Sequence, residues 1–287
     1  SCEDALFFND ERVAISETMQ FKKAGGDTIV DMSCNNIGRN PRGLVNVSNA
    51  TGLNVIMGTS YYVGESYTPE MKMESRTVDD IAEEFIRDVT VGVGGSGIRA
   101  GIIGEIGMSW PVKDGEEKVL RAAVMAQQET GAAISIHPGG SADAASGILK
   151  VLEEANADLS RVVFEHMTRT FPIEDRDGRA KLADKGCYLE YDMFGNDGIY
   201  PLYMADHDIA NDAIRISLVK ELIADGYLDR ILVSHDIGFK LNLSSYGGGG
   251  YAVLPIVIFP LMLSRGITEE QIHAITVQNA KRIYTFV

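Results

Sequence analysis

Residues 100–137, AGIIGEIGMSWPVKDGEEKVLRAAVMAQQETGAAISIH, contain the pattern that decides the fold. Two short runs rich in apolar residues, Ala100–Ile106 and Ala132–His137, flank a longer stretch with helical spacing, Gly115–Thr130. Both runs are continuous rather than alternating in polarity, which is typical of strands covered on both faces of a sheet. A strand, a helix and a second strand in succession indicate a βα unit of a parallel sheet.

The same alternation extends along the chain in both directions. The other predicted strands are Thr28–Met32, Asn54–Thr59, Arg161–His166, Gly186–Met193 and Arg230–Asp236. Helical stretches lie between them, including Val78–Asp88, Ala142–Ala155, Asp177–Lys185 and Ile214–Asp225, and a final helical pair covers Leu254–Ser264 and Thr268–Ile283. These runs predict an α/β fold with a parallel sheet.

The predicted strands number seven, whereas a closed (β/α)8 TIM barrel needs eight. A helix-like segment, Glu11–Lys23, precedes the first clear strand, so the missing strand is expected upstream of it. No linker or low-complexity segment divides the chain. We therefore predict a single barrel domain over residues 1–287, N-terminally incomplete because its first strand is missing.

Composition excludes several classes of function. A net charge of −15 over 287 residues repels phosphate backbones and anionic membranes, so neither nucleic acid nor membrane is an expected partner. The three cysteines form no disulfide framework, which predicts a cytoplasmic protein. Neither a GxxxxGK[ST] motif nor a GxGxxG motif after the first strand is present, which argues against a nucleotide site.

Potential metal ligands stand at the ends of four predicted strands: Glu105, His137, His166 and Asp236. The carboxyl ends of barrel strands meet at one face, so these side chains are expected to converge. Each residue alone is commonly structural, but the four together provide the nitrogen and oxygen ligands that zinc and similar divalent ions prefer. If Asp236 points into the barrel, strand alternation turns His235 to the other face, where a structural role is expected.

The chain resembles the phosphotriesterase family of the amidohydrolase superfamily from about residue 11 to residue 286, and within it the branch of phosphotriesterase-related and phosphotriesterase homology proteins. The segments that carry the resemblance are Gly101–Gly107, Ile136–Pro138, Glu165-His166, Glu190–Gly195, Ser234–Ile237, Tyr246–Tyr251 and Asn279–Arg282.

The resemblance implies a centre of two divalent metal ions, most commonly zinc. His137 and His166 then hold one ion, Glu105 bridges both, and Asp236 ligates the other ion and accepts a proton from the bridging hydroxide. The family takes two further ligands from an HxH motif on its first strand, and none of the five histidines here forms that motif. We therefore expect the tighter metal site in this chain at His137 and His166, with a weak or empty site beside Asp236.

Three further residues are predicted to contact the substrate. Arg169 and Lys240 follow ligand-bearing strands, and we expect them to bind an anionic group, although both could instead pair with acidic loops. Tyr62 matches a tyrosine near the metal site of the family's lactonases, but an ordinary aromatic lid residue is an equal alternative. Arg169 and Met193 replace residues of true phosphotriesterases and lactonases, so efficient hydrolysis of phosphotriesters or homoserine lactones is not expected.

The resemblance implies a hydrolase in which a metal-bound hydroxide attacks an ester, lactone or amide carbonyl of a small anionic substrate. The alternative is a non-catalytic barrel relative that has lost one metal site and acts as a binding protein. Metal content and turnover separate the two readings. Family analogy also suggests a homodimer.

Overall fold

The computed structural model describes residues 8–197 and 210–286, and within them a single parallel sheet runs in the order β1 to β7. The strands are β1 (Thr28–Asp31), β2 (Asn54–Thr59), β3 (Ile102–Gly107), β4 (Ile134–His137), β5 (Val162–Phe164), β6 (Tyr188–Tyr191) and β7 (Ile231–Val233). Each strand pairs in parallel with the next along the chain, so every connection crosses over the outside of the sheet.

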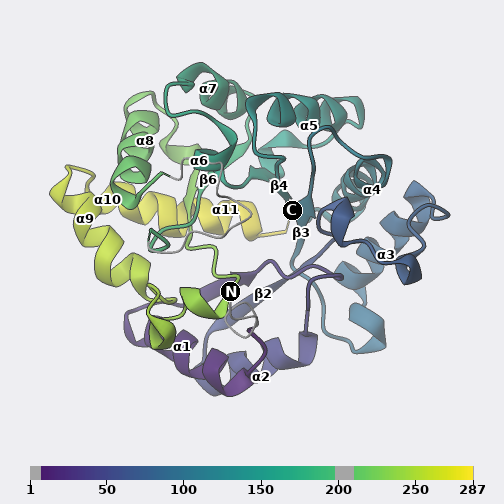
Figure 1. Cartoon of the computed structure of the whole chain (residues 1–287), viewed down its shortest axis with the longest axis horizontal. Coiled ribbons are helices and arrows are strands. Elements are labelled where there is room, and N and C mark those ends of the chain that lie inside the picture. Colours follow the sequence, from purple (N-terminus) through teal and green to yellow (C-terminus); the bar gives the residue numbers. More distant parts are fainter. Residues whose placement is uncertain (1–7, 198–209, 287) are drawn as a thin grey trace.

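Helices supply these crossovers and surround the strands (Figure 1). They are α1 (Glu11–Lys23), α2 (Pro41–Thr51), α3 (Val78–Thr90), α4 (Asp114–Thr130), α5 (Ala142–Glu154), α6 (Met167–Thr170), α7 (Arg176–Asp184) and α8 (Asp212–Ala224). None of the described helices is long and apolar enough to cross a membrane.

The sheet is open between its first and last strands. Among the described residues, β1 pairs only with β2, and β7 pairs only with β6. Seven parallel strands in sequential order within the described residues, wrapped by helices, confirm the predicted α/β barrel fold and its seven predicted strands.

The last helices close the barrel at the amino ends of its strands. Asn279 donates to the carbonyls of Leu228 and Ile231 at the start of β7, and Arg161 before β5 donates to the carbonyl of Ile283. Ile283 also packs with the apolar side chains inside the barrel. Polar residues lie at the opposite end of the barrel, at the carboxyl ends of the strands.

The C-terminal helical segments are more irregular than their sequence predicts. The predicted helix Leu254–Ser264 consists of a π-helical turn, Leu254–Ile258, followed by α9 (Phe259–Ser264). Pro260 has no N–H for the regular i to i−4 bond, and Phe259 before it bonds to Leu254 five residues back. The predicted helix Thr268–Ile283 likewise contains α10 (Glu269–His273), a π-helical segment (Ala274–Asn279) and α11 (Ala280–Tyr284).

Candidate metal centre

Strand alternation stacks three layers of side chains inside the barrel. The lowest layer is apolar and includes Ile102, Ala133, Val163, Tyr188 and Leu232. Two residues further along the strands lies a polar layer, Ser135, Glu165, Glu190 and Ser234, and two residues beyond that come His137, Asp192 and Asp236. The polar groups therefore lie at the carboxyl ends of the strands, as predicted.

Glu105 reaches the barrel interior through an irregularity in β3. Ile103 and Ile106 both pack in the outer core, although strict alternation puts residues three apart on opposite faces. The register between β3 and β4 shifts between these two isoleucines. The extra residue of this bulge allows Glu105 to point inward and meet the histidines.

His137, the last residue of β4, has its two ring nitrogens in different surroundings. Its Nδ1 lies 2.8 Å from Glu105 Oε1, 2.8 Å from His166 Nε2 and 3.2 Å from the hydroxyl oxygen of Tyr62. Its Nε2 lies 3.2 Å from Nη1 of Arg169. The imidazole is therefore placed between an acidic cluster and a cation.

His166 adopts a left-handed backbone conformation, with φ of 54°. This conformation ends β5 at Phe164, two residues earlier than predicted, and aims the ring toward Glu105 Oε1, 3.4 Å from Nε2. The backbone N–H of His166 donates to Asp192 Oδ2 at 2.6 Å, and Nδ1 lies 2.8 Å from the same oxygen. That carboxylate holds a proton on Nδ1, so Nε2 is the nitrogen that faces the cluster and could bind a metal ion.

Asp236 follows β7 at the open side of the sheet and is also left-handed, with φ of 50°. One oxygen of its carboxylate lies within 4.8 Å of ligand atoms of His166 and Asp192. The residue is exposed, but protein atoms crowd its carboxylate, and this desolvation raises its pKa to about 6 although His166 opposes the shift. Asp236 therefore ionises closer to neutrality than an ordinary aspartate.

The electrostatics of the cluster are set by burial and by close charges. Burial alone would raise the pKa of Glu105, but hydrogen bonds with His137 and His166 hold it below its usual range. Burial, and then repulsion from Glu105, raise the pKa of Glu165 well above its usual range. Burial lowers the pKa of His137, whereas at His166 the carboxylate of Asp192 outweighs burial and raises the pKa. Carboxylates outnumber fixed cations at this point, which favours a bound cation.

The structure brings together Glu105, His137, His166, Tyr62 and Arg169, and it places Asp236 beside His166. The ammonium of the remaining predicted residue, Lys240, lies 5.4 Å above the ring of Tyr246. His235 packs edge-on against Tyr251, in agreement with a structural role, and burial lowers its pKa to about 4.

Two acidic residues of the cluster were not assigned from the sequence. Glu165 joins Glu105, His137 and His166 in a group whose ligand atoms all lie within 4.8 Å of one another, and Asp192 contacts His166. Counting interior positions along β6 from Tyr188 could have found Asp192. Glu165 was missed because the neighbouring His166 was assigned to the interior. Regular alternation allows only one of two consecutive residues to face the barrel axis.

The glycine-rich loop that follows β7 is attached to α1. The carboxylate of Glu17, which is fully buried, accepts hydrogen bonds from the backbone N–H and hydroxyl groups of Ser244 and Ser245. Within the loop, Gly250 N–H donates to the carbonyl of Asn242. Four successive glycines favour a mobile loop, but these contacts hold one side of the loop against the helix.

We expect Glu17→Ala to lower the free energy of unfolding by about 2–4 kcal/mol, since several donors lose a charged acceptor. The serine donors outweigh burial and keep the pKa of Glu17 below its usual value of 4.5. Their stabilisation is therefore present at neutral pH and is lost as the pH falls through that depressed value. Urea unfolding at several pH values measures both effects.

The control for this prediction is Glu11→Ala, which removes an exposed glutamate from the first turn of the same helix. We expect it to change stability by less than about 0.5 kcal/mol. Equal stability of the two variants at neutral pH contradicts the attachment of the loop by Glu17.

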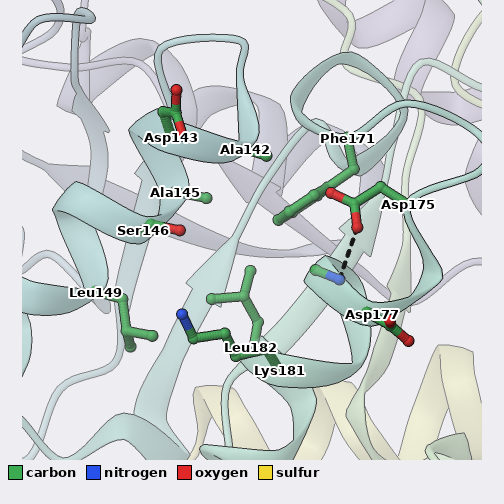
Figure 2. Close-up of a pocket in the computed structure, with 11 residues that line it drawn as sticks. Ala142, Asp143, Ala145, Ser146, Leu149, Phe171, Asp175, Asp177, Lys181 and Leu182 are labelled. Atoms are coloured by element: carbon green, nitrogen blue, oxygen red, sulfur yellow. Dashed lines mark hydrogen bonds between the residues drawn. The ribbon is translucent and has the colours of Figure 1, made fainter.

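A separate cavity lies in the outer helical ring, away from the metal ligands. It has a volume of about 250 Å³ and lies between α5 and α7, where Lys181, Leu149 and Phe171 contribute to its walls (Figure 2). Asp175, on its rim, accepts from the Gly178 N–H at the start of α7. The cavity shares no residue with the acidic cluster, so it is distinct from the candidate metal centre.

Comparison with known proteins agrees with this geometry. The model of the phosphotriesterase family matches residues 3–284. A phosphotriesterase-related protein from Nematostella vectensis is 41% identical over 95% of this chain and 77% of its own length. An N-acetyltaurine hydrolase from Danio rerio is 39% identical over all of this chain and 81% of its own.

A solved structure has the same fold. The crystal structure of a resiniferatoxin-binding protein from Rhodobacter sphaeroides superposes with a TM-score of 0.90 and 37% identity, over 96% of this chain and 75% of that one. The family match over nearly the whole sequence, and relatives at this level of identity, show that this chain is a metal-dependent hydrolase that belongs to the phosphotriesterase family.

Proposed function

We propose that this enzyme hydrolyses the amide bond of a small N-acyl compound that carries an anionic group, such as a sulfonate or carboxylate. The observation that carries the proposal is the placement of Arg169. Its guanidinium lies 3.2 Å from His137, immediately beside the cluster of candidate metal ligands. The N-acetyltaurine hydrolase relative acts, by its name, on an amide that ends in a sulfonate.

The residues of the cluster fit a divalent metal, for which zinc is our proposal. Nδ1 of His137 and Nε2 of His166 lie 2.8 Å apart, and two lone pairs at that distance need a cation or a proton between them. With Glu105 they provide the two nitrogens and one oxygen typical of a catalytic zinc site. A metal bound there supplies an activated water and polarises the substrate carbonyl.

The position of the ring proton on His137 decides whether Arg169 is available to bind the substrate. If the lone pair of Nδ1 faces the cluster, the ring proton lies on Nε2, which faces Arg169. The Nε2–H of His137 and the guanidinium N–H of Arg169 are both donors and cannot hydrogen bond to each other. The guanidinium is therefore available to another acceptor. A sulfonate or carboxylate of the substrate provides that acceptor in a bidentate contact.

The other predicted residues have complementary roles in this proposal. Asp236, with a pKa of about 6, accepts the proton released during attack on the carbonyl. The Tyr62 hydroxyl, 3.2 Å from His137 Nδ1, orients the attacking water, and Lys240 adds positive charge for the anionic group.

We expect Arg169→Met to lower kcat/KM for N-acetyltaurine by about 100-fold, mostly through KM, because a charged hydrogen-bonded contact is worth about 2–5 kcal/mol. For N-ethylacetamide, which lacks the sulfonate, the loss should be less than about fivefold, since that substrate makes no ionic contact. Steady-state kinetics with both substrates measure the difference.

The matched control is Lys181→Met, which removes a cation from the outer cavity of Figure 2 and should leave both substrates unaffected. Equal losses for the charged and neutral substrates contradict anion recognition by Arg169.

The alternative of a binding protein without turnover draws only on a structural relative that is named for binding resiniferatoxin. Metal-replete protein that hydrolyses none of a panel of N-acyl, ester and lactone substrates contradicts the proposed hydrolysis.

A further inference from the structure

Glu165 is a buried carboxylate to which the proposed chemistry gives no role. Only 4% of its surface is exposed, and it lies in the polar layer of the barrel directly before the left-handed His166. Because the backbone turns at His166, both consecutive side chains reach the barrel interior. Burial of a carboxylate is costly unless a cation or several donors compensate it.

The donors around Glu165 satisfy only part of its carboxylate. The hydroxyl of Ser135 donates to Oε1. Oε2 lies 3.9 Å from Nε2 of His166. That distance is too long for a hydrogen bond, so Nε2 offers none to Oε2, and this oxygen is available to a metal ion.

The spacing of the ligand atoms agrees with a shared ion. Four ligands at about 2.1 Å from a tetrahedral zinc lie about 3.4 Å from one another. Here His137 Nδ1 and His166 Nε2 are 2.8 Å apart, Glu105 Oε1 is 3.4 Å from His166 Nε2, and Glu165 Oε2 is 3.9 Å from it. One ligand atom from each of the four residues lies within 4.8 Å of the other three.

We propose that Glu165 is a fourth protein ligand of the metal ion held by His137, His166 and Glu105. The inference rests on the metal centre of the proposed function and extends it. Two glutamates and two neutral imidazoles balance the charge of a divalent ion without the HxH motif, so this chain holds one ion through its own residues. The rival role for Glu165 is purely electrostatic, like that expected of Glu190 in the same layer.

The test compares three variants by metal binding and by spectroscopy. Glu165→Gln removes the charge and keeps the shape, whereas Glu165→Asp keeps the charge and withdraws the carboxylate by one methylene. Glu190→Gln removes a neighbouring charge of the same polar layer and serves as the control. Zinc affinity is measured by competition with a chelator, and the visible absorption spectrum of the cobalt(II)-substituted protein reports the number and geometry of ligands.

If Glu165 is a ligand, both Glu165 variants lose zinc affinity by about 100-fold or more, since even residues behind the ligands are worth about 10–100-fold. Their cobalt spectra also change in band position and intensity. Glu190→Gln loses less than about 10-fold and keeps the wild-type spectrum. Circular dichroism melting shows whether each variant is folded. If Glu165→Gln does not fold, the comparison of Glu165→Asp with the wild type still tests the inference.

Two results overturn the inference. Wild-type cobalt spectra in both Glu165 variants show that the residue does not touch the ion. The second result is that Glu165→Asp keeps the wild-type zinc affinity while Glu165→Gln and Glu190→Gln lose zinc affinity equally. That result shows that Glu165 acts only through its charge. Failure of the wild-type chain to bind zinc or cobalt is a different outcome, and it contradicts the proposed metal centre as a whole.

Discussion

Replacement of His166 by asparagine is expected to abolish metal retention and to lower kcat/KM for N-acyl substrates by about 1,000-fold or more. The ring lies 2.8 Å from His137 and 3.4 Å from Glu105, at the centre of the cluster. Its loss removes one of two nitrogen ligands, and the metal contributes several kcal/mol to the stability of the transition state. Zinc content after dialysis and steady-state kinetics measure both effects.

The control for His166 is His273→Asn, which changes an exposed histidine in α10. It should keep the zinc content and the activity of the wild-type chain. Zinc retained by His166→Asn at the wild-type level shows that the ion binds elsewhere.

Asp236→Asn is expected to lower kcat by about 100-fold to 10,000-fold, the range typical of a lost general base. An asparagine has the same shape but cannot accept a proton. Zinc affinity should change less than in His166→Asn, because His137, His166 and Glu105 remain. Parallel measurements of kcat and of zinc content separate proton transfer from metal binding.

The control for Asp236 is Asp79→Asn, which neutralises an exposed carboxylate on α3. A kcat for Asp236→Asn within threefold of the wild-type value contradicts the role of Asp236 as proton acceptor.

The sheet was predictable from the sequence because its strands are continuous apolar runs of the right length. Helix α1 begins and ends at the predicted residues, Glu11 and Lys23. Hydrophobic periodicity depends only on which faces are buried, and strands and helices differ strongly in that respect. The convergence of Glu105, His137 and His166 followed from the rule that parallel strands end at one face.

The details of the cluster were not predictable because they depend on backbone departures from regular strands. Glu105 faces inward through a bulge, and His166 and Asp236 are left-handed at the ends of their strands. No glycine marks the left-handed positions of His166 and Asp236, and residues other than glycine rarely adopt positive φ. Alternation from Val163 turns Glu165 into the barrel, and the left-handed turn brings the neighbouring His166 to the same cluster.

The contacts of the loop after β7 depend on long-range partners. Ser244 and Ser245 meet Glu17, more than 220 residues away in sequence. Four successive glycines suggest mobility, but composition does not reveal an acceptor on a distant helix.

The most direct test of the metal centre is zinc binding to the metal-free chain, measured by chelator competition with the wild type and His166→Asn side by side. We predict about one tightly bound zinc ion per wild-type chain, held by the two histidines with carboxylate support, and a loss of that binding in the variant. Absence of tight zinc binding in the wild type, or equal affinity in both proteins, contradicts a metal centre at His137 and His166.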